Sequence, residues 1–321
     1  MDRKINPEIS ILMLTYNHEA YIEKAIQGVL NQKIDVRIEL LIGEDFSTDS
    51  TRSIVEKYEK TYPELVCPVY MRKNIGCSNN LIVLLSRAKG KYIAICDGDD
   101  YWCDPLKLSK QYQLMETHPS YVICFHQYYV YVQETKATYE DKIEFLKNGR
   151  RGIDIDLDFY IMNGWNTIPL SAFFRRNAVD IGHLKKYKAL KDISLFYNIL
   201  TKGLGYIMSD RMGVYRKHKS GIWSGASLKT RMIDDLASVR SIYEVDMDTK
   251  SETFFYQIFL NKFAEACRKH NWQLALAILK EIRKYTGHIG VIKYIFRTLH
   301  RATKHYLKTV PLISAVDSAK S

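Results

Sequence analysis

The sequence lacks the long apolar runs that cross a membrane. Hydrophobic residues make up 46% of its 321 residues and charged residues 26%, the usual mix of a soluble globular protein. No uninterrupted apolar stretch approaches the ~18–20 residues of a membrane-spanning helix, and residues 1–8 contain no apolar core of a secretory signal. We therefore expect a cytoplasmic protein with one large domain, or one domain with an appended helical tail.

Cysteine motifs and internal repeats are missing as well. None of the six cysteines forms a Cys-x-x-Cys pair, and no histidine spacing completes a zinc site. Five of the six lie in or near apolar or strand-like stretches, which predicts buried, reduced thiols. The sequence therefore gives no sign of a structural zinc site or of a disulfide framework.

Acidic residues are missing from a long stretch near the C-terminus. The formal net charge is +11, and between Glu281 and Asp317 the chain has seven basic residues and no acid. On a helix that advances ~100° per residue, five of the seven fall within an arc of about 80° over residues 289–308, opposite an apolar stripe. This pattern predicts an amphipathic helix on the inner face of an anionic membrane. Alternatively, the stripe packs on the rest of the protein and the basic side chains face water.

Short apolar runs alternate with helical patterns over residues 9–100. The alternation, with short connections, predicts a βαβαβαβ order around a mostly parallel sheet. Asn17 is expected to cap the first helix. Further strands are predicted at 121–126, 128–132, 172–175, 206–208 and 213–215, and residues 227–306 have a helical pattern. The predicted strands of the first part are 9–14, 38–42, 69–71 and 92–96, and the predicted helices begin near 22, 51 and 81.

The strongest chemical signal is a group of three carboxylates within four residues, Asp97, Asp99 and Asp100, directly after a predicted buried strand. Such carboxylates repel one another unless a cation or hydrogen-bond donors offset their charge. A hard divalent cation takes oxygen ligands and keeps positions open for substrate phosphates. In parallel sheets ligands bind at the carboxyl ends of the strands, where this group lies. An acidic turn or a helix cap is the alternative, because an Asp-x-Asp alone is a weak motif.

Further motifs in a fixed order make the signal specific. They are SILMLTYN at 10–17, EDFSTD at 44–49, RKNIG at 72–76, GKY at 90–92 and DP at 104–105. In this order and spacing the chain resembles the family 2 glycosyltransferases of the GT-A fold over residues 9–110, and more weakly as far as residue 220. The resemblance implies a Rossmann-like, mostly parallel α/β sheet flanked by helices. We expect a GT-A catalytic domain over residues 1–225 and a helical, basic C-terminal extension over 226–321.

The resemblance also assigns a donor site. Thr15, Tyr16 and Asn17 would bind the nucleotide, with Tyr16 stacking on the base. Asp45 matches the acid that accepts a hydrogen bond from a uracil N–H, which favours a UDP-sugar, and a carboxylate suits that donor. Where the family often has Asp-Asp, this chain has Glu44 before Asp45.

The phosphates and the metal occupy the rest of the expected donor site. Arg72 would neutralise the diphosphate or brace the base, and Asp97 would reach the ribose. Asp99 and Asp100 would hold Mn²⁺ or Mg²⁺ on the diphosphate. His218, in a Tyr-Arg-Lys-His stretch at 215–218, would complete the metal shell.

An inverting transfer needs a base that takes the proton of the acceptor hydroxyl. Family members place it at the start of a helix, where this chain has Asp192; the preceding Lys191 replaces an acidic residue of the family pattern. Arg216 would offset the charge of the leaving group. The alternative for Asp192 is a helix cap.

Two other functions remain open. A sugar-nucleotide nucleotidyltransferase shares the sheet topology and a metal, but it would need a Gly-rich basic loop after the first strand, where this chain has TYNHE at 15–19. A nucleic-acid-binding protein could use the basic C-terminus, but no recognised module appears, and we expect no nucleic-acid partner. The expected partners are a nucleotide-sugar donor and a glycan or lipid-linked acceptor, in the synthesis of a bacterial surface polysaccharide or another glycan.

Overall fold

The computed structural model describes residues 6–141, 146, 151–163, 167–221 and 223–283. The chain divides into two compact units, residues 1–255 and 256–321. The predicted boundary between residues 225 and 226 falls just before helix α8 (Leu228–Asp246), inside the first unit. Helix α9 covers Thr249–Arg268, and residues 272–283 are helical too. The predicted membrane helix, 289–308, lies outside the described residues.

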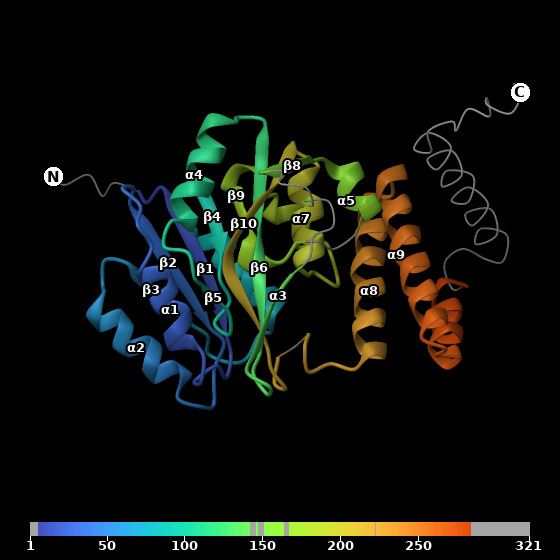
Figure 1. Ribbon diagram of the computed structural model, residues 1–321, viewed down its shortest axis with the longest axis horizontal. Coiled ribbons are helices and arrows are strands. Elements are labelled where there is room, and N and C mark those ends of the chain that lie inside the picture. Colours follow the sequence, from blue (N-terminus) through green and yellow to red (C-terminus); the bar gives the residue numbers. More distant parts are fainter. Residues whose placement is uncertain (1–5, 142–145, 147–150, 164–166, 222, 284–321) are drawn as a thin grey trace, which may run out of the picture. The chain divides into compact units, whose positions relative to one another are not determined.

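One ten-stranded sheet runs through the first unit, with helices packed around it (Figure 1). Its strand order is β3-β2-β1-β4-β9-β6-β10-β5, with β7 paired to β6 and β8 paired to β10. The strands β3, β2, β1 and β4 are parallel, whereas β9 and β5 pair antiparallel to their neighbours. The predicted α/β fold with a flanked central sheet is confirmed, and its second half mixes both strand directions.

The first half of the sheet follows the predicted alternation of strands and helices. Every residue of β1 is buried, as expected for a strand covered on both faces. The buried side of α1 carries the apolar residues at helical spacing, Ile22, Ala25, Ile26 and Val29. The elements are β1 (Ile9–Thr15), α1 (Ile22–Leu30), β2 (Ile38–Glu44), α2 (Thr51–Thr61), β3 (Val66–Tyr70), α3 (Cys77–Arg87) and β4 (Tyr92–Ile95).

The second half contains longer strands than the sequence pattern predicts. The two runs at 121–126 and 128–132 form one strand, β6, and the runs at 206–208 and 213–215 form one strand, β10. The register of β10 shifts between Met208 and Gly213, so a bulge interrupts the apolar pattern without ending the strand. The elements are β5 (Tyr101–Trp102), α4 (Lys107–Thr117), β6 (Tyr121–Val132), β7 (Ala137–Glu140), β8 (Gly152–Ile155), α5 (Leu157–Asn163), β9 (Phe173–Arg175), α6 (Ile181–Leu184), α7 (Asp192–Leu200) and β10 (Leu204–Lys217).

Two local predictions are wrong. Asn17 does not cap α1, which begins at Ile22 after Tyr21 without a side-chain cap, because the Asn17 side chain accepts a hydrogen bond from the backbone of Thr48 instead. The thiols are also less buried than predicted, since Cys77 and Cys103 are exposed in loops or at a helix start.

No helix among the described residues is long and apolar enough to cross a bilayer.

A buried lysine lies under the carboxyl end of the sheet. Lys107 is fully buried at the start of α4, and its ammonium lies 3.8 Å from the centroid of the Trp102 ring. Its Nζ has no hydrogen-bond partner among the described residues. Burial lowers the pKa of Lys107 to about 7, although the nearby Cys96 and Cys124 raise it slightly. The aromatic face therefore replaces only part of the lost hydration of the ammonium.

This burial predicts a pH dependence of stability. The pKa of Lys107 is about 7 in the folded protein against an ordinary value of 10.5, so the unfolded chain binds more protons between these values. The free energy of unfolding should then rise with pH from about 7 upward, by about 1 kcal/mol per pH unit from this group. Lys107→Met should remove this contribution, and Lys202→Met, at an exposed lysine, should keep it. Urea unfolding at pH 7, 8 and 9 gives the free energy of unfolding of each protein. An equal change of this free energy with pH in all three proteins would contradict the prediction.

Candidate active site

The loops that follow β1, β2 and β4 meet at one edge of the sheet. Thr15 and Glu44, the last residues of β1 and β2, are direct partners in the parallel register. The backbone N–H of Gly98, the third residue after β4, donates to the carbonyl of Leu14 at 2.9 Å. Strand β5 then pairs antiparallel with β10, Trp102 opposite Gly213, which brings the end of β10 to the same edge. Residues from three distant parts of the chain therefore share this edge.

The loop after β1 holds the three predicted nucleotide-binding residues. Thr15 is buried, and its hydroxyl has no hydrogen-bond partner in the part of the chain that the structure describes. The side chain of Tyr16 is 42% exposed, so its ring is open to a ligand. Asn17 has a φ of 55° and uses its side-chain oxygen to accept the backbone N–H of Thr48 at 2.8 Å. Asn17 thus ties the loop after β1 to the loop after β2.

Asp45 is buried at the end of β2 and holds the loop before α3. Its Oδ1 accepts the backbone N–H of Ile75 at 2.8 Å, and its Oδ2 accepts that of Gly76 at 2.9 Å. Gly76 has a φ of 81°, a conformation that glycine adopts without strain. Each carboxylate oxygen can accept a second hydrogen bond, so this arrangement leaves room for a base N–H. Arg72 lies exposed at the start of the same loop.

The carboxylates after β4 differ in environment. Burial raises the pKa of Asp97 to about 8, and the charges of Asp99 and Asp192 add to the shift. Asp100 is buried, and burial together with Asp99 raises its pKa well above the usual range. Its Oδ1 accepts the backbone N–H of Arg216 at 2.8 Å. In the absence of a cation, this loop therefore concentrates more negative charge than its surroundings stabilise.

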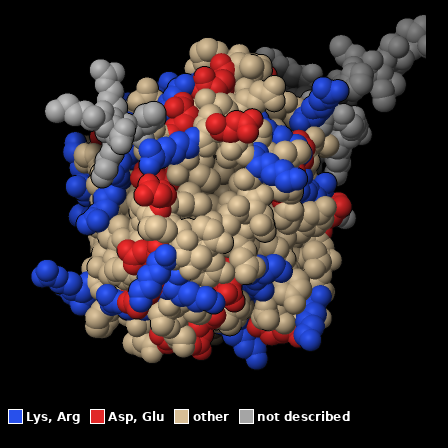
Figure 2. Space-filling model, turned by 90° about the vertical axis from the view of Figure 1, so that its left-hand side faces the viewer, with Lys and Arg blue, Asp and Glu red and all other residues tan. Residues whose placement is uncertain are grey.

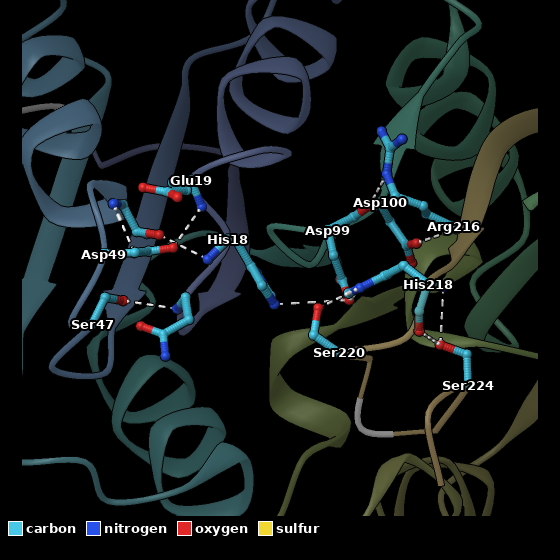
Figure 3. Close-up of polar contacts among 12 residues, drawn as sticks. His18, Glu19, Ser47, Asp49, Asp99, Asp100, Arg216, His218, Ser220 and Ser224 are labelled. Atoms are coloured by element: carbon cyan, nitrogen blue, oxygen red, sulfur yellow. Dashed lines mark hydrogen bonds and ion pairs between the residues drawn. The ribbon is translucent and has the colours of Figure 1, made fainter. Parts of the chain in front are cut away.

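Two imidazoles face the carboxylate of Asp99 (Figure 3). The Nε2 of His218 lies 3.1 Å from Asp99 Oδ2, and the Nε2 of His18 lies 3.8 Å from the same atom. Burial would raise the pKa of Asp99, but the hydrogen bond from His218 and the charges of both histidines outweigh it and hold that pKa below its usual range. Burial lowers the pKa of His18, and no described residue hydrogen-bonds to its Nδ1. His218 is fixed from the other side by Ser220, 2.9 Å from its Nδ1.

Arg216 holds in place the loop of residues 97–100, which we call the acidic loop. Its Nε donates to the carbonyl of Asp99 at 2.9 Å, and its Nη1 donates to Gln133 Oε1 at 2.8 Å. The guanidinium also lies 4.8 Å from the ring centroid of Tyr21 and 5.4 Å from that of Tyr101. Because Arg216 is buried by these contacts, its main visible role is to position the loop that carries Asp99 and Asp100.

Asp192 is the first residue of α7. Its Oδ1 accepts the backbone N–H of Ile193 at 2.9 Å. Burial raises the pKa of Asp192, and the charge of Lys191 offsets part of the shift. The Lys191 ammonium lies 3.6 Å from Asp234 of α8. The electrostatic effect of Asp192 on Asp97 indicates that α7 begins near the acidic loop.

The side chains of Asp99 and His218 fit a metal ion that also binds the phosphates of a ligand. Among the described residues no group of three or more His, Cys, Asp or Glu side chains is arranged to hold a metal ion. Asp99 Oδ2 and His218 Nε2, 3.1 Å apart, have the spacing of neighbouring ligands at ~2.1 Å from one octahedral ion, about 3 Å. Mg²⁺ and similar ions in nucleotide sites commonly use one or two protein ligands and leave the remaining positions to phosphates and water. The residues present fit that arrangement.

Sequence reasoning missed His18, Gln133 and Tyr21. The polar run at 15–19 contains His18, but a lone histidine in a loop carries no spacing that predicts a partner. Gln133 and Tyr21 reach the site only through the pairing of distant segments, which a local pattern does not reveal.

The chain belongs to the glycosyl transferase family 2, whose family model matches residues 10–182. It is 32% identical over 229 residues to uncharacterized proteins of Mycobacterium bovis and Mycobacterium tuberculosis, a match that covers 68% of this chain and 61% of theirs. The chain thus spans less than two thirds of the length of these relatives. It is also 26% identical to the UDP-Glc:alpha-D-GlcNAc-diphosphoundecaprenol beta-1,3-glucosyltransferase of Escherichia coli, over 69% of this chain and 81% of that protein.

Solved structures share the fold at low sequence identity. The Staphylococcus aureus protein TarS, residues 1–349 in complex with UDP-GlcNAc, superposes with a TM-score of 0.59 at 19% identity, over 79% of this chain and 72% of that one. A mannosyltransferase of Pyrobaculum calidifontis in complex with GDP-Man and Mn²⁺ superposes with a TM-score of 0.55 at 16% identity, over 95% and 83%. These likenesses confirm the GT-A type fold that the sequence predicts.

Close packing at Gly98 gives a testable prediction. A Cβ at this position would lie 2.8 Å from Thr15 Oγ1 and 2.9 Å from His18 Nδ1. Gly98→Ala should therefore push the two loops apart, lower the stability by about 1–3 kcal/mol, and weaken nucleotide binding. Gly182→Ala is the control, because a Cβ at that exposed position in α6 meets nothing closer than 3.4 Å. Thermal unfolding with and without UDP and Mn²⁺ compares the two, and equal behaviour would refute the packing argument.

Proposed function

We propose that this glycosyltransferase moves a sugar from a UDP-sugar to an acceptor hydroxyl, with a divalent metal and with inversion at the anomeric carbon. The observation that carries the proposal is the convergence of His18 and His218 on Asp99 at the carboxyl edge of the sheet. This arrangement is suited to a cation that bridges protein and diphosphate. The proposed acceptor is a glycan of a bacterial surface polysaccharide.

Uracil is the proposed base because a buried acid, Asp45, and an exposed ring, that of Tyr16, follow the neighbouring strands β2 and β1. Asp45 keeps free acceptor capacity on both oxygens after binding the backbone of Ile75 and Gly76. Tyr16 presents its exposed ring in the loop after β1, where it would stack on the base. The names of the Escherichia coli glucosyltransferase and of the TarS complex support a UDP-sugar, and the former also supports a lipid-linked acceptor.

In the proposed mechanism the protein holds the donor phosphates and removes one proton. Asp99 and His218 would hold Mn²⁺ or Mg²⁺, which when bound offsets the charge of the leaving diphosphate. Arg216 keeps Asp99 in place through the backbone. The acceptor oxygen attacks the anomeric carbon, the bond from that carbon to the diphosphate oxygen breaks, and Asp192 takes the hydroxyl proton. Partial burial raises the pKa of Asp192, which makes its carboxylate a stronger base.

The basic C-terminal stretch that could bind nucleic acid lies outside the described residues from residue 284 on, and the face shown in Figure 2 adds no support. Lysine and arginine side chains there alternate with aspartate and glutamate around a centre that has few charges. A surface for nucleic acid would gather basic side chains along one groove or stripe. A nucleotidyltransferase gains none either, because the loop after β1 supplies Thr15, Tyr16 and Asn17 and no run of glycines.

Replacement of Asp99 tests the metal. Asp99→Asn keeps the shape of the side chain but removes its charge, so it should abolish transfer and weaken Mn²⁺-dependent binding of UDP by at least tenfold. Asp158→Asn changes an exposed acid at the start of α5 and should do neither. Isothermal titration of UDP with Mn²⁺ or with EDTA measures the effect. Undiminished transfer in excess EDTA would overturn the metal requirement.

Replacement of Asp192 tests the base. An asparagine keeps the acceptor for the N–H of Ile193, so Asp192→Asn should leave folding and UDP affinity nearly unchanged and lower turnover by roughly 10²–10⁴-fold. Asp180→Asn removes the charge of the acid that caps α6 and serves as the control. NMR of the product linkage gives the anomeric configuration, and a retained configuration would contradict the mechanism.

A further inference from the structure

A cavity of about 490 Å³ opens beside the first turn of α3. We propose that it binds an anionic group, a carboxylate or a phosphate, carried by one of the two substrates. The inference rests on the proposed function, because it assigns a part of a substrate to a place near Asp192. The volume lies in the range of small-molecule sites, about 300–1,000 Å³, and is large enough for a sugar ring or a diphosphate.

The charged side chains that line the cavity are both lysines. Lys185 and Lys188 line it, and no aspartate or glutamate is among the residues around it. Both side chains are exposed, and neither forms an ion pair with a described residue. The remaining walls are apolar or neutral, with the ring of Tyr187 among them. An anion that enters would therefore gain two charge-assisted contacts without displacing an existing partner.

The cavity adjoins the proposed catalytic centre. Ser78 of α3 donates a hydrogen bond to the carbonyl of Leu190 at 2.6 Å, which joins the two walls. Leu190 lies two residues before Asp192, so one wall leads directly to the proposed base. Cys77, on the other wall, is exposed. A group in the cavity is therefore close to the reacting end of the site.

Two sources can supply the anion. The donor sugar can carry a carboxylate, as in UDP-glucuronate, or the acceptor can carry a diphosphate. The diphosphate of the donor is already assigned to the metal at Asp99. The name of the Escherichia coli relative describes an acceptor with a diphosphate, but the two lysines suit either group.

The test compares matched pairs of probes in the full-length protein. UDP-glucuronate is compared with UDP-glucose, and an alkyl diphosphate of N-acetylglucosamine is compared with the alkyl glycoside without phosphate. Lys185→Glu with Lys188→Glu should weaken one anionic probe at least tenfold more than its neutral partner, and leave the affinity for UDP within about twofold. The pair that responds identifies the donor or the acceptor as the source.

The control variant is Lys202→Glu with Lys229→Glu. These lysines are exposed and do not line the cavity, and both double variants lower the formal net charge from +11 by four, to +7. The control should bind all four probes as the natural protein does. If reversal of charge impairs folding, Lys185→Gln with Lys188→Gln provides the same comparison by neutralisation.

A second readout does not depend on sugar transfer. In a Cys103→Ser background, the rate at which N-ethylmaleimide modifies Cys77 reports whether the cavity is filled. Inorganic pyrophosphate should slow this reaction at least threefold in the natural protein and not in the Lys185–Lys188 variant. Equal responses of charged and neutral probes, with no protection of Cys77, would overturn the inference. Failure of the natural protein to bind UDP would instead overturn the proposed function.

Discussion

Like-charge repulsion among Asp97, Asp99 and Asp100 is the constraint on which the rest of the site depends. A loop with three carboxylates in four residues is unstable beside a buried strand unless other groups offset the charge. The protein offsets it with a backbone N–H for Asp100, a guanidinium on the Asp99 carbonyl and two imidazoles at the Asp99 carboxylate. Burial, together with the charges of Asp99 and Asp192, nevertheless raises the pKa of Asp97 to about 8. The folded protein therefore leaves carboxylate charge partly unbalanced at the place where a cation and a diphosphate would bind.

Several polar side chains near the ligand positions also hold the loops themselves. Asn17 binds the backbone of Thr48, and Asp45 binds the backbone of Ile75 and Gly76. These hydrogen bonds join the loop after β1 to the loop after β2, and the latter to the loop before α3. The positions of Tyr16 and Arg72 therefore depend on the side chains of Asn17 and Asp45. A substitution of Asn17 or Asp45 would therefore change binding through loop geometry as well as through any direct contact.

Local pattern was enough to predict the first half of the fold and the edge where the site lies. The apolar runs of β1, β2 and β4 and the buried stripe of α1 follow directly from hydrophobic periodicity. The second half was harder because the bulge in β10 breaks the pattern, and because its pairing with β5 joins segments more than a hundred residues apart. His18 and Gln133 were missed for the same reason. Their roles arise from three-dimensional neighbours, whereas Asp99 and His218 could be placed through ordered motifs.

The long separation between the partners of the acidic loop affects how the protein is made. Asp99 and His218 are 119 residues apart, and Asp100 and Arg216 are 116 apart. During synthesis at ~5–20 residues per second, about 6–24 s pass between these two parts of the chain. In that interval the strands up to β4 can already pair, while the carboxylates have neither their guanidinium nor their second imidazole. The nascent chain therefore carries an unbalanced acidic loop, and the arrival of β10 both completes the sheet and supplies part of the missing positive charge.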